Sequence, residues 1–193
     1  MFARTDRLLL RPIWPEDASA LYDAVADEAI VRNLAKAPWP YTPCDAAQFA
    51  ALDHDAMHPN FMLMLRTDGA PVLIGSCGLA DNDGEAELGY WLARPYWGQG
   101  FATEAARAVI GVARALGHRK LVSGHFTDNP ASGRVLRKIG FQPLGRIERR
   151  YSAGRGGHVD CALYELPLVH DAETEMPVPL VRMRPQTQMM QAA

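Results

Sequence analysis

The clearest hydrophobic pattern in the chain is a helical one between residues 102 and 116. Apolar side chains recur there every three or four residues, and Glu104, Arg107 and Arg114 lie opposite them. This spacing predicts an amphipathic helix that ends at Gly117. The apolar positions are Ala102, Ala105, Ala106, Val109, Ile110, Ala113 and Leu116.

Three shorter helices are predicted from apolar spacing together with capping residues. Pro15 begins the first, and the second is expected over residues 45 to about 57. Asn129 and Pro130 begin the third as cap and first helical residue, and Gly140 ends it.

Short apolar or alternating runs between turn residues predict strands. They cover residues 8–10, 61–65, 72–79, 85–93, 121–126, 141–149 and 159–166. A meander of strands followed by two strand–helix steps indicates an α+β fold. Its central sheet is mixed, with parallel pairing only near the helix crossovers.

The chain of 193 residues is 48% hydrophobic, which suffices for one well-buried domain. After about His170 the composition changes: aromatic residues are absent, and prolines and methionines accumulate. We therefore expect a domain over residues 1–170 and a flexible tail over residues 171–193.

Charge and cysteine content limit the partners and the compartment. The net charge of −2 does not indicate a nucleic-acid or anionic-membrane partner. No secretory segment or apolar run of roughly 20 residues is present, and the three cysteines lack metal-type spacing. A reduced, cytoplasmic protein is expected. Residues 119–155 nevertheless carry a net charge of +7, which fits either a solvated face or attraction for a compact polyanion.

The glycine turn between the strand at 85–93 and the long helix is the main candidate for ligand binding. Its glycines, Gly98 and Gly100, let a phosphate approach the backbone, and the helix N-terminus exposes N–H groups to it. A dinucleotide fold would have a third glycine where Thr103 stands and an acid roughly 20 residues later. A nucleoside-triphosphate loop would need Gly-Lys-Ser/Thr, which is missing.

Four motifs, in their order and spacing, resemble those of the GCN5-related N-acetyltransferases (GNAT). They are Glu87-Leu88-Gly89-Tyr90-Trp91-Leu92, the turn from Trp97 onward, Asn129-Pro130-Ala131-Ser132 and Ile139-Gly140-Phe141. They are similar, more narrowly, to the RimJ/RimL type that acetylates ribosomal-protein N-termini, and the resemblance covers roughly residues 5–168.

This resemblance implies the GNAT fold, a mostly antiparallel sheet with a splayed strand pair at the acetyl-CoA site. It also implies that coenzyme A contacts Leu92, Gly98, Gln99, Gly100, Phe101, Ala102, Thr103 and Asn129.

The catalytic residues follow less directly, because the chain departs from the family in two places. Trp97 stands where Gln or Arg is usual, and Leu136 stands where the superfamily often has a tyrosine acid. Ser132 is the best substitute as donor to the leaving thiolate, although a first-turn serine can also simply bond its own backbone. Glu87 is the candidate base for the attacking amine, unless it only faces solvent.

The amine pocket is assigned by resemblance to Trp39, Tyr41 and Tyr151, with Arg155 nearby; packing is the alternative role for the aromatic residues. No metal is expected. The run from His54 to His58 nearly spells a zinc-protease motif, but Pro59 would end the helix and Asp55 is too short for the glutamate's role.

The resemblance thus implies an acetyl-CoA-dependent N-acetyltransferase, and the lack of an evident activated nucleophile indicates that a primary amine attacks the thioester directly. A protein N-terminal amine is one acceptor; a small-molecule amine, or succinyl transfer, is the alternative. A non-catalytic acyl-CoA sensor is the rival from another class, and a nicotinamide-nucleotide protein ranks last. A monomer and a homodimer both remain open.

Overall fold

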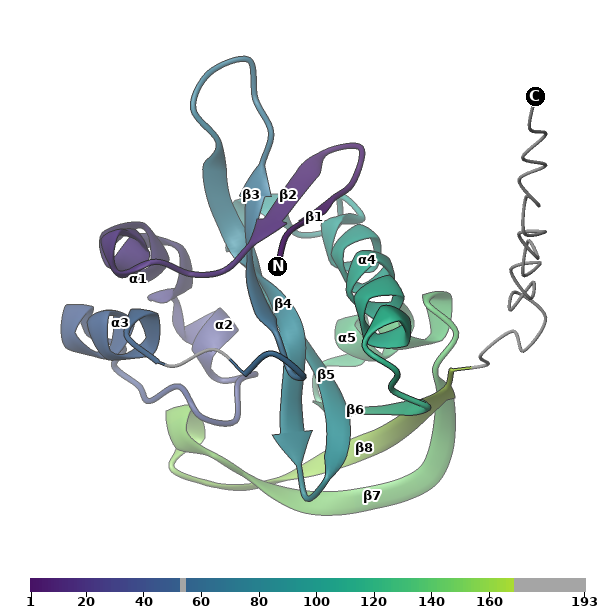
Figure 1. Ribbon diagram of the computed structural model, residues 1–193. Helices are drawn as coiled ribbons and strands as arrows, with labels where there is room; N and C mark the ends of the chain where they lie inside the picture. Colours follow the sequence, from purple (N-terminus) through teal and green to yellow (C-terminus); the bar gives the residue numbers. More distant parts are fainter. Residues whose placement is uncertain (53–54, 169–193) are drawn as a thin grey trace, which may run out of the picture.

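A single eight-stranded sheet organises the protein in the computed structural model, which describes residues 1–52 and 55–168 (Figure 1). The strand order is β1-β2-β3-β4-β5-β6-β8-β7, and every neighbouring pair is antiparallel except β5–β6. The strands are β1 (Ala3–Arg4), β2 (Leu8–Arg11), β3 (Asn60–Leu65), β4 (Val72–Asn82), β5 (Glu85–Leu92), β6 (Lys120–Phe126), β7 (Gln142–Ser152) and β8 (Gly157–Pro167).

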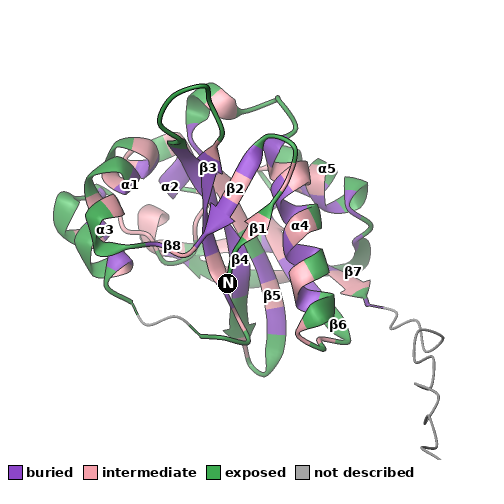
Figure 2. Cartoon of the chain, turned by 45° about the horizontal axis from the view of Figure 1, so that its top comes forward, coloured by how far each residue is buried: buried purple, intermediate pink, exposed green. Residues whose placement is uncertain are grey.

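Helices cover both faces of this sheet (Figure 1). They are α1 (Ala18–Val25), α2 (Glu28–Val31), α3 (Pro43–Ala50), α4 (Phe101–Ala115) and α5 (Pro130–Lys138). One core cluster joins the sheet to α4 and α5 through Ala105 and Leu136, among others. A second joins it to the three N-terminal helices through residues such as Leu21 and Ala46. Figure 2 shows the resulting pattern, with buried residues on the strands and on the sheet-facing side of α4.

The parallel neighbours β5 and β6 are splayed. Glu87 lies opposite Val122, and no further Cα pair joins the two strands within the described residues. Beyond that point Ser123 Oγ donates to the carbonyl oxygen of Leu88 at 2.8 Å, so a side chain replaces the next step of the ladder. The predicted α+β fold with a splayed strand pair is confirmed.

The prediction for the second helix was wrong at both ends. The helix α3 begins at Pro43, because Thr42 caps it: Thr42 Oγ1 accepts from the N–H of Asp45, whose carboxylate accepts from the N–H of Thr42. It ends at Ala50, seven residues before the predicted end, and a turn follows. Pro59 comes too late in the chain to set this end, because the helix has already stopped at Ala50.

One short helix was not predicted, and the predicted tail is not part of the described structure. The four-residue helix α2, capped by Asp27, was not predicted because it is too short to show a period. The predicted tail over residues 171–193 lies outside the described residues, as does His54. Within the described ranges, no helix has the length and apolar character needed to cross a membrane.

Gly78 on β4 is a position where any side chain would strike the neighbouring strand. An added Cβ would lie 2.5 Å from Asn60 Cα and 2.7 Å from the carbonyl oxygen of Pro59. We expect Gly78→Ala to lower the free energy of unfolding by about 2 kcal/mol, measured by urea denaturation. In the control Gly111→Ala, on α4 with nothing within 4 Å, the same substitution should raise it by up to about 1 kcal/mol. Equal effects at the two sites would contradict the close approach of β3 and β4.

Asp17 connects the start of α1 to β2. Its carboxylate accepts from Arg11 Nη1 and Nη2 at 2.6 and 2.7 Å and from the N–H of Trp14 at 2.8 Å. The hydrogen bonds from Arg11, opposed by burial, hold the pKa of Asp17 below its ordinary value of 3.8. The ionised form therefore stabilises the fold above that pH, and the contribution is lost as the pH falls through the lowered pKa.

We expect Asp17→Asn to lower the free energy of unfolding by about 2 kcal/mol at pH 7. The difference from the wild type should shrink as the pH falls from 3.8 through the lowered pKa of the native carboxylate, below which Asp17 is neutral in both states. The exposed neighbour Glu16, changed to Gln, is the control for loss of charge alone. A difference that is the same at every pH would rule out the carboxylate's charge as its source.

Candidate active site

The glycine turn has the backbone conformation that only glycine adopts without strain. Gly98 has φ 74° and Gly100 has φ 84°, and Gly100 is the N-cap of α4. The turn is exposed, and the hydrogen bonds found among the described residues provide no acceptor for the N–H groups of residues 98–103. These N–H groups and the positive end of the α4 dipole are therefore available to an anion.

Arg7, in the loop between β1 and β2, holds this turn in place. Arg7 Nη1 donates to the carbonyl oxygen of Gln99 at 3.1 Å, and its Nε donates to Glu104 Oε2 at 2.7 Å. The guanidinium also lies 4.1 Å above the ring of Phe101. Burial would raise the pKa of Glu104, but the bonds from Thr5 and Arg7 outweigh it and keep the pKa below its usual value. Arg7 carries no sequence signal for this role, because its partners lie more than ninety residues away.

Trp97 explains one departure from the family pattern. Its indole N–H donates to the carbonyl oxygen of Leu92 at 2.7 Å and so ties the turn to the end of β5. Trp97 is 46% exposed, so its side chain acts through this hydrogen bond more than through burial.

The backbone of β5 presents N–H groups to the gap between β5 and β6. Ala93 donates its N–H to Ile74 on β4, and Leu88 accepts from Ser123 on β6. Because strand residues alternate, Tyr90 and Leu92 also direct their backbone toward β6, where the strands have separated. The carbonyl oxygen of Leu92 is taken by Trp97, which leaves the N–H groups of Tyr90 and Leu92 facing the gap.

Ser132 lies on the opposite side of this gap, in the first turn of α5. Asn129 caps the helix, since its Oδ1 accepts from the N–H of Ser132 at 3.4 Å. The hydroxyl of Ser132 lies 2.8 Å from the hydroxyl of Tyr90, which reaches across from β5. Burial raises the pKa of Tyr90, so its phenol stays protonated.

Glu87 lies on the other face of β5 from Tyr90. Tyr90 packs against the cluster under α4 and α5, whereas Trp91 packs against the cluster under the N-terminal helices. Alternation places Glu87 on the same face as Trp91. Its carboxylate forms an ion pair with Arg150 of β7, and the two side chains are 23% and 28% exposed. The structure thus places Glu87 and Ser132 on either side of the splayed pair.

The three aromatic residues predicted for the amine pocket have different environments. Trp39 and Tyr151 are 40% and 54% exposed, whereas Tyr41 is 9% exposed and packs in the N-terminal helix cluster. Two hydrogen bonds hold the β7–β8 hairpin against the loop before Trp39: Ser152 Oγ to the carbonyl oxygen of Leu34, and Ala153 N–H to that of Ala35. The structure therefore brings together the two segments that carry Trp39 and Tyr151.

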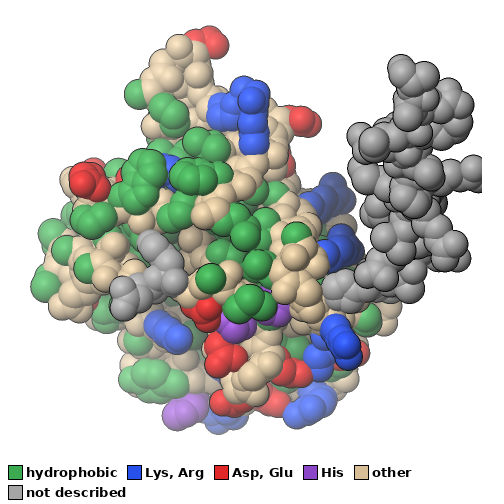
Figure 3. Space-filling model, viewed as in Figure 1, with side chains coloured by type: hydrophobic (Ala, Val, Ile, Leu, Met, Phe, Trp, Pro, Cys, Tyr) green, Lys and Arg blue, Asp and Glu red, His purple; other side chains and the backbone are tan. Residues whose placement is uncertain are grey.

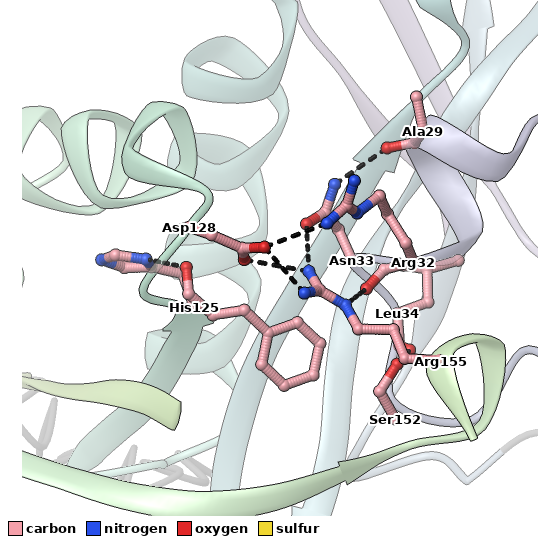
Figure 4. A network of polar contacts seen from close by, with 9 residues as sticks. Ala29, Arg32, Asn33, Leu34, His125, Asp128, Ser152 and Arg155 are labelled. Atoms are coloured by element: carbon pink, nitrogen blue, oxygen red, sulfur yellow. Dashed lines mark hydrogen bonds and ion pairs between the residues drawn. The ribbon is translucent and has the colours of Figure 1, made fainter. Parts of the chain in front are cut away.

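Arg155 belongs to a polar network between these segments (Figure 4). It donates to both carboxylate oxygens of Asp128, at 2.7 and 2.9 Å, and to the carbonyl oxygen of Arg32 at 2.6 Å. Arg32 also pairs with Asp128. Hydrogen bonding from Arg155 is the main reason that the pKa of Asp128 lies below its ordinary value. The Asp128–Arg155 network thus joins three segments: the β7–β8 hairpin, the loop that follows α2, and Asp128 itself, which directly precedes the α5 cap Asn129.

Much of the positive charge of residues 119–155 is already paired. Figure 3 shows acidic and basic side chains interspersed over the lower part of this face. The pairs are Lys120–Glu85, Arg146–Glu148, Arg149–Asp160, Arg150–Glu87 and Arg155–Asp128. The hypothesis that this stretch as a whole attracts a polyanion is weakened, and the turn at Gly98 is the stronger anion site.

The near-match to a zinc motif makes local hydrogen bonds in the structure. His58 Nδ1 lies 2.6 Å from Asp55, and the carbonyl oxygen of Met57 contacts His118 Nε2 at 2.8 Å. Within residues 1–52 and 55–168, no three His, Cys, Asp or Glu side chains are grouped so that they could hold a metal ion.

Comparison with known proteins gives the family. Residues 7–142 match the family model described as the acetyltransferase (GNAT) domain. The chain is 32% identical over 171 residues to the uncharacterized N-acetyltransferase YoaA of Bacillus subtilis, covering 84% of this chain and 94% of that protein. It is 27% identical to the uncharacterized N-acetyltransferase p20 of Bacillus licheniformis, covering 84% and 93%. The chain belongs to the GNAT acetyltransferase family, as the motifs predicted.

Solved structures agree on the fold. A GNAT-family acetyltransferase from Bacillus anthracis superposes with a TM-score of 0.75 at 24% identity, covering 86% of this chain and 98% of that one. RimL, the ribosomal L7/L12 α-N-protein acetyltransferase solved with coenzyme A, gives 0.73 at 19% identity, covering 87% and 98%. The acetyltransferase MccE, solved with acetyl-CoA and AMP, gives 0.70 at 18% identity, covering 85% and 94%.

Proposed function

We propose that this protein transfers an acetyl group from acetyl-CoA to a primary amine, with a protein N-terminal α-amine as the favoured acceptor. The observation that carries the proposal is the glycine turn, whose N–H groups lie at the N-terminus of α4 beside the splayed strands. RimL and MccE, which share the fold, were solved with coenzyme A and acetyl-CoA respectively, and this supports the choice of donor.

The residues around the turn suit the parts of coenzyme A. The N–H groups of Gly98, Gln99, Gly100, Phe101, Ala102 and Thr103 would bind the pyrophosphate. Leu92 would pair its backbone N–H with the pantetheine arm, as an added strand would. The side-chain oxygen of Asn129 caps α5, so its amide NH2 is the part left to reach the cofactor.

Catalysis rests on bringing the amine and the thioester together in the gap. The N–H group of Tyr90, directed into the gap, would stabilise the oxyanion that forms when the amine attacks. Glu87 would accept the amine's proton on one face of β5, and Ser132 would donate to the leaving sulfur on the other. Because the two groups lie on opposite faces, acceptor and donor can approach from opposite sides.

The ion pair of Glu87 with Arg150 favours the N-terminal acceptor. Arg150 engages one carboxylate oxygen of Glu87, so the site offers limited help in taking a proton and suits an amine that is already partly neutral. An α-amino group titrates near ~8, whereas a lysine amine titrates near ~10.4. Trp39 and Tyr151 would flank this amine, and Tyr41 would support them from the core.

An assay for free thiol, run with acetyl-CoA against peptide N-termini and small amines, tests the proposal. We expect turnover with peptide N-termini, and Gly100→Glu should abolish acetyl-CoA binding by steric block and charge repulsion. The matched control is Gly84→Glu, also at a glycine with positive φ but in the β4–β5 turn, and it should bind normally. Turnover only with small amines would show that the acceptor is a small-molecule amine and not a protein N-terminus. Tight binding without turnover on any amine would indicate a sensor, and absence of binding would refute the proposal.

Arg7→Met tests the support of the turn. We expect the Kd for coenzyme A to rise about tenfold, because the turn loses both its hydrogen bond to Gln99 and a nearby positive charge. The measurement is titration calorimetry, with Arg4→Met as the control for loss of an exposed arginine on β1. Equal Kd values for the two variants would show that Arg7 does not organise the turn for the cofactor.

A further inference from the structure

We propose that Tyr90 is a positioning residue for acetyl transfer: its phenol donates to Ser132 Oγ and thereby directs the Ser132 O–H at the thioester sulfur. This inference rests on the proposed function, because it gives Ser132 its orientation. Tyr90 lies in the motif from Glu87 to Leu92, in which the resemblance gives its side chain no role.

The side chain of Tyr90 spans the gap between the splayed strands. Its residue belongs to β5, and its hydroxyl reaches the first turn of α5, the helix that follows β6. The phenol oxygen lies 2.8 Å from Ser132 Oγ and 3.0 Å from the carbonyl oxygen of Ser132. Both distances are those of good hydrogen bonds, so one hydroxyl faces two acceptors on the same residue.

Counting protons shows that this pair has two arrangements. If Tyr90 donates to the carbonyl oxygen, Ser132 donates to Tyr90, and its only proton is used. If Tyr90 donates to Ser132 Oγ, the Ser132 O–H is free to point at a third atom. Among the described residues, Tyr90 is the only hydrogen-bond partner of Ser132 Oγ. A thioester sulfur in the gap would select the second arrangement without moving any heavy atom.

The second arrangement also makes Ser132 a better donor. A hydroxyl that accepts a hydrogen bond donates a stronger one, and the effect is larger in a partly buried site. Because burial raises the pKa of Tyr90, the phenol keeps its proton and remains a donor throughout the reaction.

No proton leaves Tyr90 in this scheme. The amine nitrogen forms its bond to the acetyl carbon, the carbon–sulfur bond breaks, and the amine's proton passes to Glu87 and then to water. The sulfur leaves as a thiolate that accepts the Ser132 hydrogen bond and is later protonated by solvent.

The position of Leu136 agrees with this arrangement. Leu136 is a fully buried residue of α5, and its side chain has no polar atom. The phenol that α5 lacks there comes instead from the facing strand, and it acts through Ser132 rather than on the sulfur itself.

Titration of the thiol of bound coenzyme A tests the pair without any acceptor amine. Thiolate absorbance in the ultraviolet, recorded with saturating coenzyme A, gives the pKa of the bound thiol. A hydrogen bond from Ser132 stabilises the thiolate, so we expect this pKa to lie below that of free coenzyme A. In Tyr90→Phe it should rise by about half a unit or more, and in Ser132→Ala by at least as much.

The matched control is Tyr164→Phe. Tyr164 is a buried tyrosine of the core cluster against which Tyr90 packs, and its hydroxyl accepts from Arg137 Nη1 at 3.0 Å. This variant should leave the pKa of the bound thiol unchanged, because the hydroxyl that it removes contacts Arg137 and His125 and not Ser132.

Kinetics give the second readout. Tyr90→Phe should lower kcat about fivefold or more with the KM for acetyl-CoA within about twofold, and adding it to Ser132→Ala should cause no further loss. A merely structural phenol would instead raise KM, lower the melting temperature and leave the thiol titration unchanged; that combination would overturn the proposal.

The outcomes separate this inference from the proposed function. If the wild type binds coenzyme A but acetylates no amine, the proposed activity fails while the thiol titration still decides the role of Tyr90. If Tyr90→Phe titrates and turns over like the wild type, the role of Tyr90 fails and the activity stands.

Discussion

The structure depends on one interrupted pairing, that between β5 and β6. These parallel strands share the Glu87–Val122 pair and then diverge, and Ser123 closes the ladder with its side chain. Everything assigned to the site lies around the resulting gap: the backbone N–H groups of β5, the glycine turn that follows it, and α5, which follows β6. If β5 and β6 were hydrogen-bonded along their whole length, those N–H groups would be used in the ladder and no room would remain for an acyl group.

Most parts of the site are held by contacts distant in sequence. Arg7 and Trp97 fix the glycine turn, Tyr90 reaches Ser132, and Arg150 pairs with Glu87. Such contacts lower the cost of organising the site when a substrate binds, because the groups are already in place. In the proposed function, the splayed strands and the positive-φ glycines together form a preorganised site for the cofactor.

Much of the fold could be predicted from the sequence, because its signals are local. The apolar period of α4, the Asn129 cap and the turn glycines gave the main elements, and the spacing of the motifs gave the family. Two errors came where local signals are weak: α2 is one turn long, and α3 ends without a glycine or proline. The start of α3 is different, because Thr42, Pro43 and Asp45 form a local capping signal from which it could have been predicted. The network of the site could not be predicted, since Arg7 with Gln99, or Arg155 with Asp128, become neighbours only when the sheet has formed.

The Asp128–Arg155 network has a consequence for how this enzyme could diversify. Asp128 precedes the cap of α5, which is proposed to lie on the donor side, while Arg155 and Arg32 come from the two segments proposed to flank the acceptor. Loops are usually the freest part of a scaffold to vary, but here a new hairpin would have to bring its own cation for Asp128. If these segments bind the acceptor as proposed, acceptor preference and donor geometry would be inherited together, and the hairpin would not be exchangeable by itself.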